Sequence, residues 1–298
     1  MLRVIGHIFT FIFFLAIFLS SLLPSSFLYI ADIAGIVAFA IFALLLARGL
    51  TYTQNVFKYF LRLAITAFGV ELLLILAECF LEINFAGLNI VFTYAAALGF
   101  IVGLNLALNS SYMLVMRLQT NEGANSRDSR PFNKSIQPGS YNLPPWLGLA
   151  LGAATMLLSL YASWRMDFNL SIYGILLVAC FFLALIDPLE DVAEEKYFSK
   201  RPLLVKLIRR SIFYHEKHFA RAFLLLLGFN TVFYLIEFSL YRSTANPNYF
   251  FSFLVFIPAV LLPRRTPDHS TKTRILHYAT FPLMLLVLAA LRYLLVLS

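Results

Sequence analysis

The feature that most constrains the fold is a series of long apolar segments that recur along nearly the whole chain of 298 residues. A helix needs about 20 predominantly apolar residues to cross the hydrocarbon core of a bilayer. Nine segments meet or approach this length, and they cover residues 5–23, 27–47, 58–81, 88–116, 146–164, 170–186, 220–240, 248–263 and 276–296. The sequence therefore predicts an all-α, polytopic integral membrane bundle with about nine transmembrane helices.

The composition agrees with this prediction, because 61% of the residues are hydrophobic and only 13% are charged. Soluble domains are nearer half apolar and a quarter charged. The net charge is +8, and the basic residues that produce it lie mainly between the apolar segments. This placement predicts contact with membrane lipids and no nucleic-acid partner. We expect the first apolar segment to be retained as a helix, since it is longer than the apolar part of a signal peptide.

The placement of lysine and arginine predicts the orientation of the bundle. Most of these residues lie in alternate connections, at Arg3 and within 48–62, 117–145, 187–219 and 264–275. The other connections carry only Arg165 and Arg242. Because positive residues favour the cytoplasmic side, we expect the N-terminus to be cytoplasmic. We expect the protein to lie in a bacterial inner (plasma) membrane.

The stretch 118–145 is polar, rich in Gly, Ser, Asn and Pro, and without apolar periodicity. It predicts a flexible cytoplasmic linker between the two halves of a single transmembrane domain that covers residues 1–298. Two glycine pairs with GxxxG spacing stand on either side of it, Gly99/Gly103 and Gly148/Gly152. Small residues at this spacing let two helices approach closely, and we predict such packing within one bundle in preference to a dimer interface.

Five carboxylates crowd into the nine positions that follow the sixth apolar segment. They are Asp187, Glu190, Asp191, Glu194 and Glu195. In a helix these offsets place all five on one stripe, where like charges repel one another. The positive end of a helix that begins at Asp187 explains the first three acids, but Glu194 and Glu195 lie beyond its first turn.

Two kinds of compensation for this charge remain open. In the first, solvent and the basic segment 203–221 compensate the negative charge, and the acids are simply the solvent-exposed start of a helix. We predict the segment 203–221 to be an interfacial helix. In the second, the carboxylates hold Mg²⁺, which proteins bind through one or two carboxylates together with substrate phosphates. Lys200 and Arg201 follow at once and suit the phosphates that such a metal would bridge.

These residues resemble the UbiA superfamily of intramembrane prenyltransferases over roughly 105–204. Asp187, Asp191 and Glu195 stand in D-x3-D-x3-E spacing and are followed by "SKRP". Tyr112 and Arg117, in "YMLVMR", are similar to the family's tyrosine-plus-basic motif. The Gly148/Gly152 pair after "PPW" resembles a glycine pattern at the start of the family's fifth helix.

The resemblance implies nine transmembrane helices and acidic motifs after the second and sixth of them. It also implies roles for single residues. Catalytic carboxylates that hold Mg²⁺ against a prenyl diphosphate would be Asp187, Asp191 and Glu195. Substrate-binding residues would be Tyr112, Arg117, Lys200 and Arg201, with transfer to an unknown acceptor. The connection 48–62 contains no Asp or Glu, so the family's first acidic motif is missing here.

Two other classes of function therefore stay open beside an isoprenoid-diphosphate transferase. The missing motif favours a non-catalytic multi-pass subunit or assembly factor with a membrane-protein partner. Glu71, Glu78 and Glu82 share one face of the third apolar segment, which keeps open a transporter that uses intramembrane glutamates. The plainer explanation of such residues is contact between helices, for example between Glu237 and Arg292.

Overall fold

The computed structural model is a helical bundle, and the residues that it describes contain no β-strand. Those residues are 1–53, 55–81, 83, 85, 89–119, 144–186, 203–213, 215–241, 247–263 and 271–297. The α-helices are α1 (Leu2–Phe18), α2 (Ser25–Tyr52), α3 (Val56–Leu81), α4 (Ile90–Gln119), α5 (Pro145–Arg165), α6 (Ser171–Leu185), α7 (Leu203–Arg210), α8 (Glu216–Tyr241), α9 (Phe256–Leu261) and α10 (Thr271–Arg292). A 3₁₀-helix, η3 (Pro247–Val255), precedes α9, and a π-helix, η4 (Tyr293–Leu297), follows α10.

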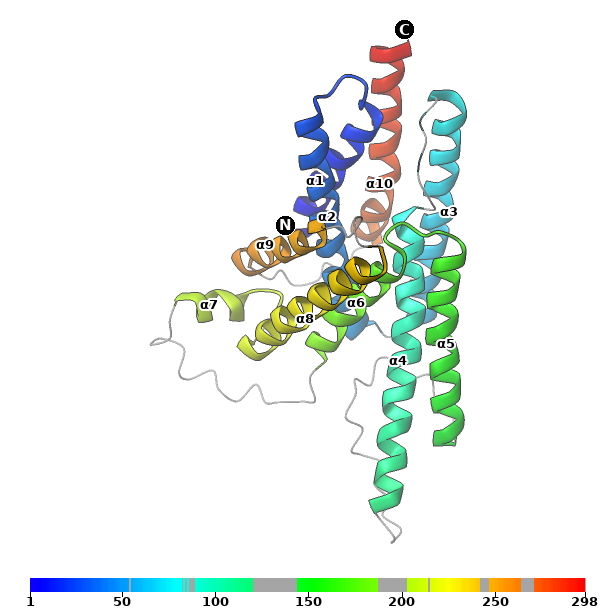
Figure 1. Ribbon diagram of the computed structural model, residues 1–298, viewed down its shortest axis with the longest axis vertical. Helices are drawn as coiled ribbons and strands as arrows, with labels where there is room; N and C mark the ends of the chain where they lie inside the picture. The colour runs from blue at the N-terminus through cyan, green and yellow to red at the C-terminus, as the bar shows by residue number, and fades with distance from the viewer. Residues whose placement is uncertain are drawn as a thin grey trace.

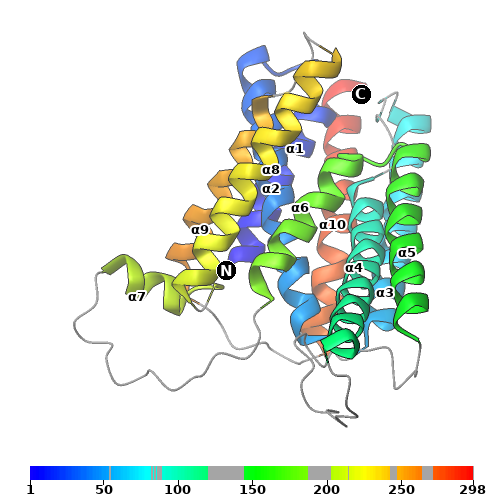
Figure 2. The same cartoon turned by 60° about the horizontal axis from the view of Figure 1, so that its bottom comes forward.

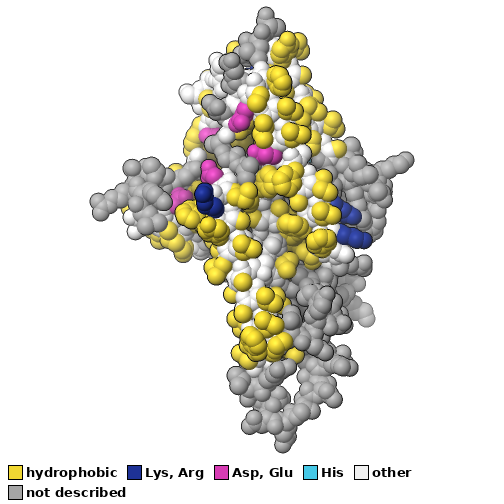
Figure 3. Space-filling model, turned by 90° about the vertical axis from the view of Figure 1, so that its right-hand side faces the viewer, with side chains coloured by type: hydrophobic (Ala, Val, Ile, Leu, Met, Phe, Trp, Pro, Cys, Tyr) yellow, Lys and Arg dark blue, Asp and Glu magenta, His cyan; other side chains and the backbone are white. Residues whose placement is uncertain are grey.

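Five of these helices are long and apolar enough to cross a membrane, namely α2, α3, α4, α5 and α8. Four shorter apolar segments accompany them, at Leu2–Phe18, Ser171–Leu185, Pro247–Leu261 and Ala279–Leu295. On the face shown in Figure 3, apolar side chains are spread over the described surface and charged side chains are few, as expected for a protein that contacts lipid. These features confirm the predicted all-α membrane bundle, and each predicted apolar segment overlaps one helical segment.

The two glycine pairs meet in a hairpin of α4 and α5, which lie side by side (Figure 1). A β-carbon at Gly103 would lie 2.7 Å from the carbonyl oxygen of Gly152, and one at Gly152 would lie 2.6 Å from the carbonyl oxygen of Gly103. Such distances leave no room for any side chain. The predicted close packing within one bundle is therefore confirmed.

The core of the bundle lies around α2 and α6, which pack against each other. The rings of Phe39 and Tyr94 are stacked, with centroids 4.9 Å apart, and join α2 to α4. On the other side of α6, the Tyr173 hydroxyl donates a hydrogen bond to Asn230 Oδ1 at 3.1 Å, and Asn230 Nδ2 donates to Ser252 Oγ at 2.9 Å. This buried polar chain joins α6, α8 and η3.

The segment 203–221 is not the single interfacial helix that its composition predicts. It forms α7, a turn and the start of α8, and α7 runs across the direction of the long helices at one end of the bundle (Figure 2). Ser211 ends α7, because its hydroxyl donates to the Ile208 carbonyl oxygen at 2.6 Å and accepts from the Phe213 N–H at 3.2 Å. A hydroxyl that bonds to nearby backbone in this way competes with helix continuation.

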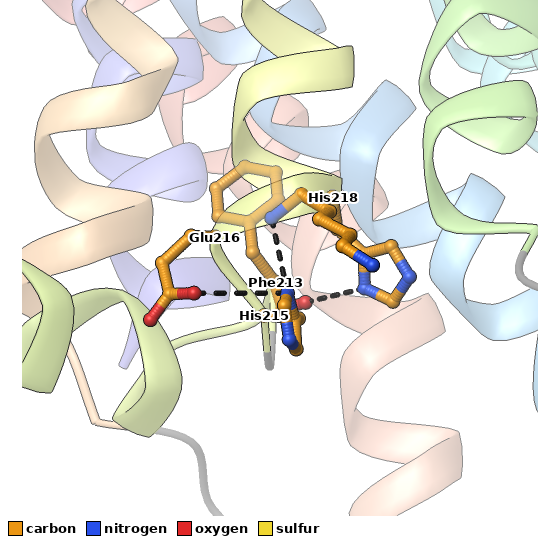
Figure 4. Close-up of polar contacts among 5 residues, drawn as sticks. Phe213, His215, Glu216 and His218 are labelled. Carbon is orange, nitrogen blue, oxygen red and sulfur yellow. Dashed lines mark hydrogen bonds and ion pairs between the residues drawn. The ribbon is translucent and has the colours of Figure 1, made fainter. Parts of the chain in front are cut away.

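Arg48, in the last two turns of α2, holds this turn to the bundle by donating a hydrogen bond to the Ile212 carbonyl oxygen at 2.8 Å. Figure 4 shows the other side of the turn, where His218 Nδ1 lies 2.8 Å from the Phe213 carbonyl oxygen. His215 Nδ1 accepts from the Lys217 N–H at 3.1 Å. Both histidines therefore take part in the turn that starts α8.

Candidate functional site

The candidate site is a cavity of about 650 Å³ at the centre of the bundle. Its walls come from α1, α2, α3, the start of α4, the α5–α6 turn, η3 and α10. Six phenylalanine rings line it, those of Phe13, Phe14, Phe39, Phe42, Phe85 and Phe281. Binding sites for small molecules are usually concave, mostly apolar and of this size, so the cavity suits a ligand with a large apolar part.

Three of the polar residues that line the cavity come from elements that meet at one end of it, whereas His7 lies beside Phe42 at the other end. Asp32 comes from the second turn of α2, Asn169 from the α5–α6 turn and Asn248 from the start of η3. The Tyr29 hydroxyl lies 3.4 Å from Asn248 Oδ1 and so links α2 to η3. Asp32 is exposed, which shows that the cavity reaches the surface at this end. We call Asp32, Asn169 and Asn248 the polar rim.

The wall beside α3 is formed where the chain turns back on itself. Asn89 Nδ2 donates to the Ala67 carbonyl oxygen at 2.8 Å, so the chain returns from Leu81 to the middle of α3 before α4 begins. At 1.5 Å per residue this return covers about 21 Å. Asn89 then caps α4, because its Oδ1 accepts from the Val91 N–H at 3.0 Å.

Two glutamates of α3 bind the backbone of this return. Glu71 Oε2 accepts from the backbone N–H and the side-chain amide of Asn89, at 3.0 and 2.8 Å. Glu78 Oε1 accepts from the Phe85 N–H at 2.9 Å. Non-helical backbone inside a membrane bundle must find such partners, since hydrocarbon offers none. Glu71 and Glu78 therefore have a structural role, and Glu82 lies outside the described residues.

We expect Glu71→Gln to preserve this contact, because the amide keeps one acceptor oxygen, and to lower the free energy of unfolding by less than about 1 kcal/mol. Glu71→Leu should lower it by about 2 kcal/mol, since a buried N–H of Asn89 then lacks an acceptor. Thermal unfolding of the purified variants in detergent measures both values. Equal losses in the two variants would contradict the assigned role.

The predicted contact between Glu237 and Arg292 is wrong. Arg292 donates from Nε to the Leu81 carbonyl oxygen at 3.1 Å and from Nη1 to the Phe18 carbonyl oxygen at 2.7 Å. Glu237 Oε1 instead lies 3.5 Å from the Tyr249 hydroxyl. The arginine binds the last residues of α1 and α3, where helix carbonyls lack intrahelical partners.

The residues proposed to bind metal and diphosphate fall largely outside the described residues. These are Asp187, Asp191, Glu195, Lys200 and Arg201, and most of the predicted linker, 120–143, lies outside as well. Tyr112 is half-buried on α4, about 27 Å along the helix from Tyr94, which lines the cavity. The backbone of Arg117 belongs to the last turn of α4.

The cavity and Ile186 lie toward different ends of the bundle. Arg221 donates to the carbonyl oxygen of Ile186, the last described residue before the acids, at 3.4 Å. That end also holds the turn bound by Arg48. Between Phe42, at the inner limit of the cavity, and Arg48, the buried residues Leu44 and Ala47 of α2 belong to the packed core.

Sequence reasoning missed the polar rim, although one signal was present. Asp32 is the single acidic residue in the apolar stretch 25–51. Within the described part of the chain, no three His, Cys, Asp or Glu side chains are grouped closely enough to hold a metal ion. Comparison of the chain with models of protein families, with curated proteins and with solved structures gives no match.

Proposed function

We propose that the protein binds an isoprenoid chain, or a lipid of comparable length, in the central cavity. The observation that supports this most directly is the cavity of about 650 Å³ with its phenylalanine lining. An apolar chain that enters it replaces contact with lipid by contact with aromatic rings, which offer large apolar surfaces without polar demands. The polar rim then lies beside whatever head the ligand carries.

The proposed arrangement in the membrane has nine spans with a cytoplasmic N-terminus. The nine spans would be the five long helices and the four shorter apolar segments. The orientation follows from the concentration of lysine and arginine in alternate connections. The polar rim then faces the non-cytoplasmic side, whereas residues 187–201 are cytoplasmic. Labelling of single cysteines, introduced at Arg165 and Lys200 in a Cys79→Ser/Cys180→Ser background, tests it. Both sites on one side would refute the orientation.

The reaction that we propose is UbiA-like transfer of a prenyl group from its diphosphate, at the segment 187–201. Asp187, Asp191 and Glu195 fit Mg²⁺ by their chemistry, because this ion prefers oxygen ligands. Lys200, Arg201 and Arg117 would neutralise the diphosphate as its bond to the prenyl carbon breaks. The acceptor forms the new bond to that carbon and loses a proton.

Binding of a prenyl diphosphate in the presence and absence of Mg²⁺ tests this reaction site. We expect binding to weaken at least about tenfold when Mg²⁺ is removed or when Asp191→Asn and Glu195→Gln are combined, since charge-assisted contacts to phosphate are then lost. Calorimetry on the purified protein in lipid nanodiscs measures the affinity. Unchanged binding in the double variant would refute the metal site.

A non-catalytic lipid-binding subunit is the second candidate function. It is favoured by the packed residues between the cavity and the end at which Ile186 lies, because a reaction needs both substrates at one point. It is also favoured by the absence of acids from 48–62. Under this candidate function the protein still binds an isoprenoid chain or comparable lipid in the cavity, but it does not convert the lipid into a product.

Lipid binding in the cavity is tested by filling it. Ala38 lines the cavity and is 4% exposed, so Ala38→Phe should lower the affinity for farnesol at least about tenfold by occupying the space of the chain. Ala153→Phe is the matched control, because Ala153 is exposed on α5 and faces outward. Equal affinities of the two variants for farnesol, measured by calorimetry in nanodiscs, would refute the proposed cavity.

A further inference from the structure

The chemistry of the polar rim restricts the head of the cavity ligand. Asp32 is the one residue of the types Asp, Glu, Lys and Arg among the described residues that line the cavity, and His7 of α1 also lines it, beside Phe42. A carboxylate only accepts hydrogen bonds, through two oxygens. Among the residues that the structure describes, Asp32 has neither a hydrogen-bond nor an ion-pair partner. Its acceptor sites therefore remain available to a ligand.

The neighbours of Asp32 at the rim add acceptor capacity and no positive charge. The side chains of Asn169 and Asn248 each carry an amide oxygen, which accepts, and an amide nitrogen, which donates. No Lys or Arg among the described residues lines the cavity. An anionic head at the rim would thus meet a carboxylate with no lysine or arginine beside it, and the two negative charges would repel each other.

The opposite holds for a head that donates hydrogen bonds. A hydroxyl donates one hydrogen bond to the Asp32 carboxylate, and a protonated amine donates several and adds charge attraction. The apolar part then extends from Asp32 towards Phe42, ten residues further along α2, which is about 15 Å. This length is comparable to that of a farnesyl chain.

We propose that the central cavity is selective for a single-chain lipid whose head donates hydrogen bonds and carries no negative charge. The proposal rests on the proposed lipid binding and deepens it by naming the head. It assigns the cavity to an alcohol or an amine and not to a prenyl phosphate.

Three probes with the same chain and different heads test the proposal: farnesol, farnesylamine and farnesyl monophosphate. Calorimetry is done in phosphatidylcholine nanodiscs, without Mg²⁺, on a variant that combines Asp191→Asn, Glu195→Gln, Lys200→Gln and Arg201→Gln. This variant lacks both the carboxylates and the cations that we propose to bind diphosphate in the segment 187–201. We expect the alcohol and the amine to bind at least about tenfold more tightly than the monophosphate. Equal affinities, or tightest binding of the monophosphate, overturn the selectivity.

Asp32→Asn, added to the same background, tests the role of the carboxylate itself. It is nearly isosteric, and we expect it to weaken the amine about tenfold, to strengthen the monophosphate, and to change farnesol by less than about threefold. The matched control is Asp167→Asn, because Asp167 is exposed in the same α5–α6 turn as Asn169 and does not line the cavity. Asn also tolerates the positive φ of 51° at that position.

The outcomes separate this inference from the proposed function. Failure of all three probes to bind overturns both, since no lipid then occupies the cavity. Binding of all three with one affinity, unchanged by Asp32→Asn, leaves lipid binding intact and overturns the head-group selectivity alone. Loss of the preference for the amine in Asp32→Asn, with Asp167→Asn like the parent, supports the proposal.

Discussion

Gly152→Leu is expected to destabilise the protein by about 3 kcal/mol or more, because its side chain has no space between α4 and α5. A β-carbon there already lies 2.6 Å from the Gly103 carbonyl oxygen and 2.8 Å from the Ala107 backbone nitrogen. Both are backbone atoms, so no rotation of a neighbouring side chain relieves the clash. The two helices must separate, and the contacts along the whole hairpin weaken with them.

Gly228→Leu is the matched control, because a β-carbon at Gly228 on α8 meets no atom within 4 Å. It should leave stability unchanged or raise it slightly, since glycine is a poor helix former. The midpoint of thermal unfolding and the yield of monodisperse protein in detergent measure the difference. Similar midpoints for the two variants would show that the hairpin is not packed as described.

Arg292→Met is expected to lower the free energy of unfolding by about 3 kcal/mol, because two buried helix ends lose their hydrogen-bond donor. The acceptors are the backbone carbonyls of Phe18 and Leu81, two residues whose exposed fractions are 0% and 5%. Each is the last residue of its helix, where a positive charge is also favoured by the helix dipole. The guanidinium therefore holds α1, α3 and α10 together at one end.

Arg292→Lys should recover about half of this loss, since an ammonium lacks the planar fork that reaches two carbonyls at once. Arg165→Met is the control for removal of a positive charge, because Arg165 is exposed at the end of α5. We expect it to change stability by less than about 0.5 kcal/mol. Equal losses in Arg292→Met and Arg165→Met, measured by thermal unfolding, would contradict this role.

Local signals explain why the sequence predicts the helices and close packing at the glycine pairs. The apolar segments are long, and two glycines four residues apart let another helix approach closely. That Gly103 and Gly152 meet each other is known only from the structure. The return after α3 could not be predicted in this way. It depends on contacts between Glu71 and Asn89, which lie 18 residues apart.

The candidate site was less accessible to sequence reasoning, because the cavity is built from seven elements that are distant in the chain. Asp32 stands out as an acid in an apolar segment, but nothing in the sequence brings Asn169 and Asn248 to its side. The wrong pairing of Glu237 with Arg292 has the same origin. Opposite charges suggested a contact, whereas the arginine found carbonyls at the ends of two helices.

The chain that returns from the end of α3 to the start of α4 is held by two glutamates of α3, and this dependence also affects how the protein is inserted into the membrane. Transmembrane helices generally insert singly and associate afterwards. Inserted alone, α3 presents Glu71 and Glu78 to hydrocarbon. The N–H groups of Phe85 and Asn89 have no acceptor until they bind these two glutamates. Insertion and tertiary folding are therefore coupled in this region. Until the return has been synthesised, Glu71 and Glu78 lack the backbone partners that they have in the folded protein.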